Sequence, residues 1–416
     1  MTNTPKISRR AGLALGAGAA TTALASKTSH AQAKEVKIAM LVPLSGPYAR
    51  QGILEQMGAE LAIEEINEAG GIKSLGGAKM KLMTYDTGDS SETAKNAAQR
   101  MIASEPDLVG GFGCWLSSFT LAATEITERA ELPWLTLSYS DLITDRGFKY
   151  VFQTAPTGGQ QAQDLVPILV DLATRTTGKR PTKVAMVGDN TGASVAIRKA
   201  LEEKVLPEQK IQIVLNQIYT PPLNDATPVV QPVRTARADF AILLSTSGSD
   251  DKLLVDKFQE LGMGGGKMPL VGNGGHWATP ELLKNTGKEN LNGMIIGLAN
   301  WPGKLQEALS AKFIARTKEA WFGHDSIFAY AHVQIFKTAL EAAGAADRAK
   351  VTAAIRAMDI TDGPALLYPD GRIKFDAKGR REGARMVIIQ WQNGKLETIY
   401  PLERATAPAI WKSQTG

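Results

Sequence analysis

The residues best suited to hold a small ligand lie at two junctions between a predicted strand and a predicted helix. The first junction follows a glycine-rich strand end and holds Trp115 and Ser117, and the second holds Ser138, Tyr139 and Ser140. Backbone N–H groups at a helix start lack intrahelical partners and carry the positive end of the helix dipole. Two such starts at the carboxyl edge of a sheet predict a neutral carboxylate site. Ordinary capping of the two helices by Ser117 and Ser140 is an equally open interpretation.

Residue patterns typical of enzymes are absent from the sequence. The three histidines beyond residue 33 are His276, His324 and His332, and none has a metal-binding spacing. His332 lies within an apolar helical pattern and is expected to be structural. No G-x-S-x-G elbow occurs, and the glycine-rich turn at 262–267 lacks the Ser or Thr of a phosphate loop. We therefore predict a protein that is not an enzyme and has no metal or cofactor, with an unmarked enzyme site as the alternative.

The net charge depends strongly on the first 33 residues. The chain has 416 residues and a net charge of +5, but this segment holds four Lys and Arg and no acid. The rest therefore carries 43 of the 47 basic residues against 42 acidic ones, a net charge of +1. A basic start, a short apolar stretch and Ala31-Gln32-Ala33 are typical of a signal peptide, either twin-arginine-like or Sec. We expect a soluble periplasmic protein with no nucleic-acid partner and no membrane insertion.

Strands and helices alternate along the chain. Strands are expected at 36–42, 80–85, 108–111 and 133–137, with helices at 53–66, 90–103 and 118–130. A second series has strands at 183–187, 211–218, 240–244, 269–271 and 294–298, with helices at 160–174, 193–203 and 250–261. Residues 304–357 look almost wholly helical, and strands at 372–375, 386–391 and 396–400 end the chain, the last two joined by an Asn-Gly turn. This order predicts an α/β protein with parallel sheets.

The sequence beyond residue 33 resembles the branched-chain amino acid type of periplasmic binding proteins, the leucine/isoleucine/valine-binding substrate receptors of ABC importers. The matching segments are 37–47, 58–72, 85–86, 144–152, 183–187 and 370–376. The resemblance implies two doubly wound parallel-sheet lobes joined by three crossovers, the type I periplasmic binding fold. It assigns residues 1–33 to the signal peptide, 34–156 plus 299–361 to one lobe, and 157–298 plus 362–416 to the other.

The resemblance also implies the site. A ligand carboxylate is expected at Ser117, Ser138 and Ser140. Further residues expected around the ligand are Tyr139, Trp115, Tyr48, Gln51, Thr246, Asn273 and Trp301.

The sequence departs from the amino-acid binders on the side of the ligand ammonium. Those proteins place an acidic residue after the strand that corresponds to 269–271, whereas residues 272–277 here contain no Asp or Glu. Ala193 and Thr246 stand where the family has aromatic residues. A buried ammonium needs a carboxylate partner. We therefore favour an aromatic or aliphatic acid as the ligand, and an amino acid is the alternative ligand.

The predicted function is an exported, monomeric receptor that delivers a small carboxylate ligand to a membrane ABC permease. A periplasmic sensor module of the same fold is the alternative, and a periplasmic enzyme is less favoured. A neighbouring permease gene would favour transport, and a neighbouring receptor kinase gene would favour sensing.

Overall fold

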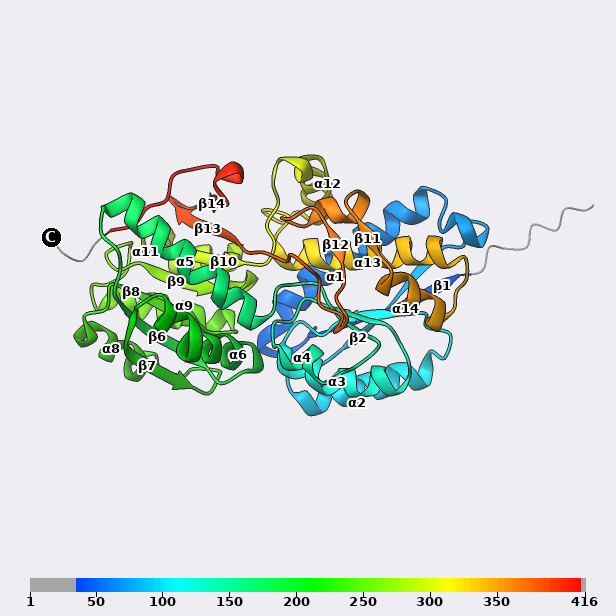
Figure 1. Cartoon of the computed structure of the whole chain (residues 1–416), viewed down its shortest axis with the longest axis horizontal. Coiled ribbons are helices and arrows are strands. Elements are labelled where there is room, and N and C mark those ends of the chain that lie inside the picture. The colour runs from blue at the N-terminus through cyan, green and yellow to red at the C-terminus, as the bar shows by residue number, and fades with distance from the viewer. Residues whose placement is uncertain (1–34, 413–416) are drawn as a thin grey trace, which may run out of the picture. The chain divides into compact units, whose positions relative to one another are not determined.

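The computed structural model describes residues 35–412. The predicted signal peptide at 1–33 lies outside the described residues. Element labels are those of Figure 1.

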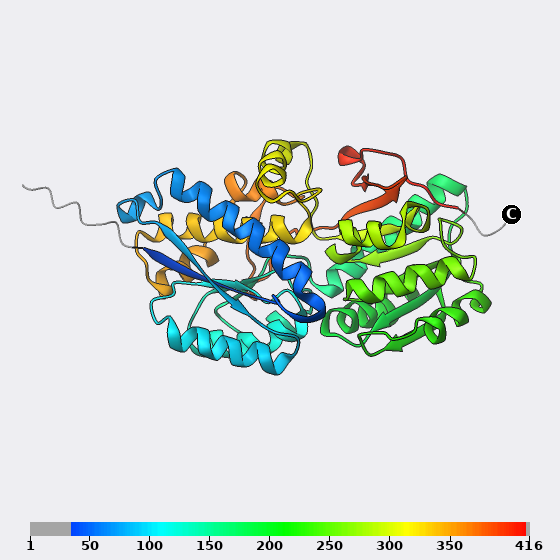
Figure 2. The ribbon, with the colours of Figure 1, turned by 180° about the vertical axis from the view of Figure 1, so that it is seen from behind.

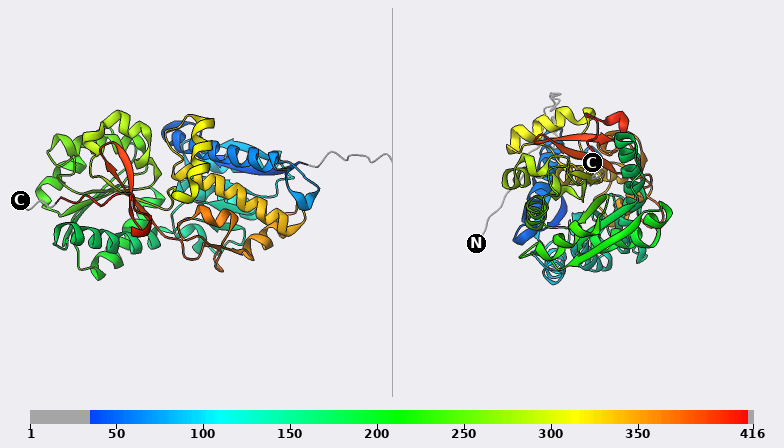
Figure 3. Two further views of the ribbon diagram at one scale, coloured as in Figure 1. Left: turned by 90° about the horizontal axis from the view of Figure 1, so that it is seen from above. Right: turned by 90° about the vertical axis from the view of Figure 1, so that its left-hand side faces the viewer.

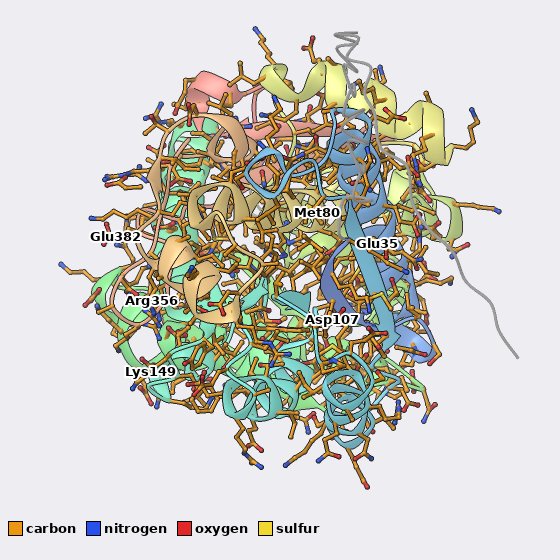
Figure 4. All side chains as sticks on the ribbon, turned by 90° about the vertical axis from the view of Figure 1, so that its right-hand side faces the viewer. Glu35, Met80, Asp107, Lys149, Arg356 and Glu382 are labelled. Atoms are coloured by element: carbon orange, nitrogen blue, oxygen red, sulfur yellow. The ribbon has the colours of Figure 1, made fainter. Side chains whose placement is uncertain are left out.

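The first sheet has five parallel strands in the order β2-β1-β3-β4-β5. These strands are β1 (Val36–Val42), β2 (Met80–Asp86), β3 (Gly111–Gly113), β4 (Trp134–Thr136) and β5 (Val151–Gln153). Val36 pairs with Met80, and Figure 4 shows Met80 close to Glu35, where the two strands begin. β1 is buried along nearly its whole length, as expected for a strand covered by helices on both faces.

Two helix pairs cover the first sheet. α1 (Ala49–Glu68) and α13 (His324–Ala343) pack along each other on one side, and α2 (Ser91–Ser104) and α3 (Ser117–Arg129) pack on the other (Figures 1 and 2). Gly58 permits the close approach of α1 to α13, because a Cβ there would lie 2.1 Å from the Ser326 carbonyl oxygen.

Shorter helices complete this lobe. They are α4 (Leu142–Asp145), α12 (Glu307–Thr317) and α14 (Arg348–Arg356). Arg356 of α14 donates to the carbonyl of Lys149, and both residues are labelled on the same face in Figure 4.

The second sheet has seven strands in the order β14-β13-β10-β9-β8-β6-β7. Its parallel strands are β6 (Lys183–Asp189), β7 (Gln212–Tyr219), β8 (Phe240–Leu244), β9 (Leu270–Asn273) and β10 (Ile295–Leu298). Its helices are α5 (Gly158–Thr177), α6 (Gly192–Ala200), α7 (Leu206–Glu208), α8 (Thr227–Ala236), α9 (Gly248–Glu260), α10 (Pro280–Thr286) and α11 (Lys288–Leu291). The predicted α/β class with two lobes is therefore confirmed.

A hairpin completes the second sheet. β13 (Val387–Gln392) pairs antiparallel with β10 and with β14 (Lys395–Tyr400), and Figure 3 shows the red hairpin against the green strands of this lobe. Asn393 and Gly394 both have positive φ, as the predicted Asn-Gly turn requires.

The stretch around 372–381, which the sequence assigned to the second lobe, contacts the first sheet. β12 (Ile373–Lys374) pairs with β11 (Asp359–Ile360), and Arg380 forms a bridge with Gln153 of β5. The buried Arg381 guanidinium donates to the Thr154 carbonyl at 2.8 Å, which fixes this stretch against the first lobe.

Within residues 35–412, no helix combines the length and apolar character needed to cross a bilayer. The same residues contain no group of three or more His, Cys, Asp or Glu placed to hold a metal ion.

Candidate functional site

Residues of both lobes line one pocket. It encloses about 460 Å³ of space between protein atoms, part of it open to solvent. The first lobe contributes Trp115, Leu116, Ser117, Leu137, Ser138, Tyr139 and His324, and the second contributes Ala193, Ser194, Ile197, Leu244, Ser245, Thr246, Asn273, Gly274, Gly275 and His276. None of these is Asp, Glu, Lys or Arg, so the wall is apolar with a few neutral polar groups and two imidazoles. Such a surface suits a small ligand with an apolar body.

Ser117 is placed by the junction between β3 and α3. It is the first residue of α3, and the preceding Leu116 gives the helix start no side-chain cap. The Ser117 hydroxyl oxygen accepts from the backbone N–H groups of Tyr139 at 3.0 Å and Ser140 at 3.1 Å. Because a hydroxyl has two acceptor sites and one hydrogen, the Ser117 O–H is left to donate to a ligand in the pocket.

The helix start predicted at Ser138–Asp141 is not found there. Residues 137–141 are irregular, and the helix that follows, α4, has only four residues. The Ser138 hydroxyl lies 2.7 Å from the Trp115 carbonyl and 2.6 Å from Thr120 Oγ1, so it is bonded within the protein. The first helix therefore starts at Ser117 as predicted, whereas the second starts only at Leu142 and not at Ser138–Asp141. Local backbone-to-side-chain bonds at Ser117 and Ser138 hold this loop instead.

Trp115 is held in an unusual conformation. Its φ is 61°, a region that costs a non-glycine residue about 1–3 kcal/mol. Its indole Nε1 donates to Asp325 Oδ1 at 3.0 Å, and its carbonyl accepts from Ser138. Burial raises the pKa of Asp325 above its usual range. These contacts fix the indole ring in the pocket wall.

Tyr139 and His324 form a second fixed contact. The Tyr139 hydroxyl lies 3.0 Å from His324 Nε2, and His324 Nδ1 lies 3.2 Å from the Asn300 carbonyl oxygen. Burial lowers the pKa of His324, so the ring is neutral and Nδ1 carries its hydrogen toward the carbonyl. Nε2 then accepts from the tyrosine hydroxyl. Burial, and then the nearby Asp325, raise the pKa of Tyr139.

The second lobe supplies polar groups from two strand ends. Thr246 follows β8 and donates to Asp189 Oδ2 at 2.6 Å, and Asn273 ends β9 and donates to Gln161 Oε1 at 3.0 Å. Ala193 stands at the start of α6 and adds no bulk, as its small size predicted.

His276 is the remaining polar group of the second lobe. It lies in the 3₁₀ turn Gly275–Ala278 after β9 and is buried, and its Nδ1 lies 2.6 Å from Asp251 Oδ2 on α9. Burial by itself would lower the pKa of His276, but the Asp251 carboxylate outweighs burial and the pKa is raised.

Four predicted site residues do not line the pocket. Ser140 contributes its backbone N–H to Ser117, and Gln51 is buried in α1. Tyr48 packs against Trp115, with the two ring centroids 5.8 Å apart and the rings tilted by 38°. Burial, and then Asp189, raise the pKa of Tyr48 to about 12. Trp301 lines two other pockets, one formed in part by residues 302–307 and 403–406 and one formed in part by Ala278 and Asp325.

Sequence reasoning missed His276 and His324. His276 follows Asn273 by three residues in a glycine-rich loop that contains no acidic residue. His324 begins α13, far from both junctions in sequence. A polar residue directly after a strand end is the signal that could have found His276.

Most of the chain matches known proteins. The sequence matches the profile of the periplasmic binding proteins over residues 35–395. It is 29% identical over 407 residues to Leu/Ile/Val-binding protein homolog 8 of Brucella melitensis, covering 94% of this chain and 96% of that one. It is 31% identical over 380 residues to homolog 7 of the same organism, covering 88% and 92%.

Solved structures share the fold. The branched-chain amino acid substrate-binding protein LivJ of Streptococcus pneumoniae, in complex with isoleucine, superposes with a TM-score of 0.73 at 20% identity, covering 88% of this chain and 98% of that one. A solute-binding protein of R. palustris in complex with benzoate superposes with a TM-score of 0.72 at 18% identity, covering 91% and 98%.

Proposed function

This chain belongs to the periplasmic binding protein family, as the resemblance predicts, and on that premise we propose that it captures a small organic acid for an ABC importer. The ligand occupies the pocket between residues of the two lobes. The names of the relatives support a role in solute uptake. The protein acts after export, as a receptor that hands its ligand to a membrane permease.

The observation that carries the proposal is the composition of the pocket wall. Among residues 35–412 no acceptor is bonded to the Ser117 O–H, and Trp115 and Tyr139 add aromatic side chains to the wall. The side chains of Leu116, Leu137, Ile197 and Leu244 surround the remaining space. A carboxylate at Ser117 would receive a charge-assisted hydrogen bond, and its apolar body would be removed from water.

The same wall favours an acid without an ammonium group. No carboxylate lines the pocket, so an amino acid would bury its ammonium without an anionic partner there. A neighbour of this fold holds benzoate and another holds isoleucine, so the fold accommodates both kinds of ligand. We therefore place aromatic and aliphatic monocarboxylates first among the ligands.

A thermal-shift screen of the chain from Lys34 tests this function. The screen compares aromatic acids, aliphatic acids and amino acids, each at several concentrations. A ligand that binds only the folded protein raises the Tm, and the stabilisation grows with the logarithm of ligand concentration over Kd. We expect acids without an ammonium to give the largest shifts. If only amino acids stabilised the protein, the proposed ligand class would be wrong.

A further inference from the structure

His276 presents one ring nitrogen that the protein does not use. Nδ1 is engaged by Asp251, whose carboxylate is also bonded by the Ser245 hydroxyl. Nε2 has no hydrogen-bond partner among residues 35–412, although the side chain is only 3% exposed and lines the pocket. Because His276 lines the pocket and its Nδ1 is already bonded, Nε2 is the ring atom that can meet a ligand atom.

The backbone around His276 keeps this nitrogen open. Gly274 has a φ of 113°, which favours glycine, and a Cβ there would lie 2.7 Å from Nε2. Gly275 also has no room for a side chain, because a Cβ would lie 2.8 Å from Asp325 Oδ2. Gly274 therefore leaves Nε2 unobstructed, and Gly275 lets the loop pass close to Asp325 and His324.

The charged groups near the imidazole all face away from the pocket. Asp251 on α9 bonds Nδ1, Asp189 at the end of β6 accepts from Thr191 and Thr246, and Asp325 on α13 accepts from Trp115. His324 on α13 is the other titratable ring, and it accepts from Tyr139.

The three aspartates Asp251, Asp325 and Asp189 all raise the pKa of the His276 imidazole. Although burial opposes the charged ring, the pKa of His276 is raised, mainly by Asp251 and further by Asp325 and Asp189. The Asp251 contact at Nδ1 stabilises the protonated ring, and in that form Nε2 carries a hydrogen and is a donor.

We propose that His276 sets the specificity of the second lobe by donating its Nε2–H to a second oxygen of the bound acid. The ligand class is then an α-keto acid or another acid with an acceptor oxygen beyond its carboxylate. An amino acid with an ammonium at that place would set two donors against each other. The inference rests on the proposed function, since it assumes that an acid occupies this pocket.

Titration calorimetry with three matched probes tests the inference. They are α-ketoisocaproate, isocaproate and leucine, which share one carbon skeleton and carry an oxygen, nothing or an ammonium next to the carboxylate. We expect wild type to bind α-ketoisocaproate about 10-fold or more tighter than isocaproate, the size expected for a hydrogen bond to a charged group. Leucine should bind weakest.

The variants separate His276 from general effects. His276→Leu should remove the preference for α-ketoisocaproate and keep the affinity for isocaproate. His332→Gln, a change at a buried histidine outside the pocket, should keep the preference. A preference that survives in His276→Leu would overturn the inference.

A second measurement uses wild type alone, so that the inference can be tested even if His276→Leu does not fold. In wild type, affinity for α-ketoisocaproate should fall as pH rises through the His276 pKa, and affinity for isocaproate should fall less. Equal pH dependence would contradict the role of His276. If both acids bind equally, the inference fails while the proposed function stands, and if only leucine binds, the proposed function fails too.

Discussion

The backbone N–H of Gly192 donates to the hydroxyl oxygen of Ser118 at 3.1 Å, which joins the start of α6 in the second lobe to the start of α3 in the first. This contact lies beside the pocket, since Ser117 and Ala193 are the neighbouring residues on each helix and both line it. Separation of the lobes would break it. The contact therefore couples the approach of the two lobes to the closure of the site.

Gly192→Val should lower affinity for a bound acid by about 10-fold or more. A Cβ at this residue would lie 3.3 Å from Ser117 Cβ and from Ser118 Oγ, so the larger side chain would hold the two helix starts apart. Calorimetry with the best acid from the thermal screen measures the effect. Gly248→Val is the matched control, because Gly248 also begins a helix, α9, and has open space around it. Equal losses in both variants would refute this coupling.

Ser117→Ala should weaken binding of an acid by about 1–3 kcal/mol, the range for a lost hydrogen bond to a charged group. The substitution removes the free O–H and also the acceptor for two backbone N–H groups. Ser140→Ala is the control, because Ser140 does not line the pocket and uses its backbone there. A ligand held elsewhere would bind Ser117→Ala as tightly as wild type.

Trp115→Phe should destabilise the protein more than Trp277→Phe. Both indoles are buried, but Trp115 Nε1 donates to Asp325, whereas Trp277 Nε1 has no partner in the described chain. The extra loss should be about 1–3 kcal/mol, because Asp325 is left buried with an unsatisfied oxygen. Urea unfolding of the two variants gives the comparison, and equal stabilities would mean that the Trp115 contact contributes nothing.

Glu55→Gln should make the unfolding free energy less sensitive to alkaline pH. Burial, and then the nearby Asp325, hold the pKa of Glu55 well above its usual 4.5, and neither carboxyl oxygen has a hydrogen-bond partner among residues 35–412. A raised pKa in the folded state gives stability that is fully present below the unfolded value and is lost as pH rises through the folded one. The variant should therefore gain stability relative to wild type as pH rises.

Glu64→Gln, on the same helix, should change the pH dependence of the unfolding free energy in the opposite direction. The Arg316 hydrogen bond lowers the pKa of Glu64, so this residue contributes stability above its unfolded pKa that is lost as pH falls. Unfolding curves from acid to alkaline pH measure both variants: the Glu64 effect is expected at the acid end and the Glu55 effect at higher pH. A pH dependence of Glu55→Gln that matched wild type would show that Glu55 is not the buried, protonated group.

The fold could be read from the sequence wherever a local pattern decides it. β1 and β8 begin and end where the apolar runs do, and the Asn393-Gly394 turn gave the hairpin. The stretch at 372–381 was misplaced, because its position depends on Arg381 reaching the Thr154 carbonyl far away in sequence.

The site was harder to predict because tertiary contacts build it. Ser117 was found from its place at a strand end, but the inward hydrogen bond of Ser138 to Trp115 depends on the neighbouring junction. His276 acquires its role from Asp251, which lies on another element, so no local pattern marks the pair.

A crystal structure of the protein with the acid that raises the Tm most is the most direct test of the account. We predict that the acid lies in the pocket lined by Trp115 and Tyr139, with a carboxylate oxygen within hydrogen-bond distance of Ser117 Oγ. An acid bound outside this pocket, or one whose carboxylate points away from Ser117, would contradict the central claim.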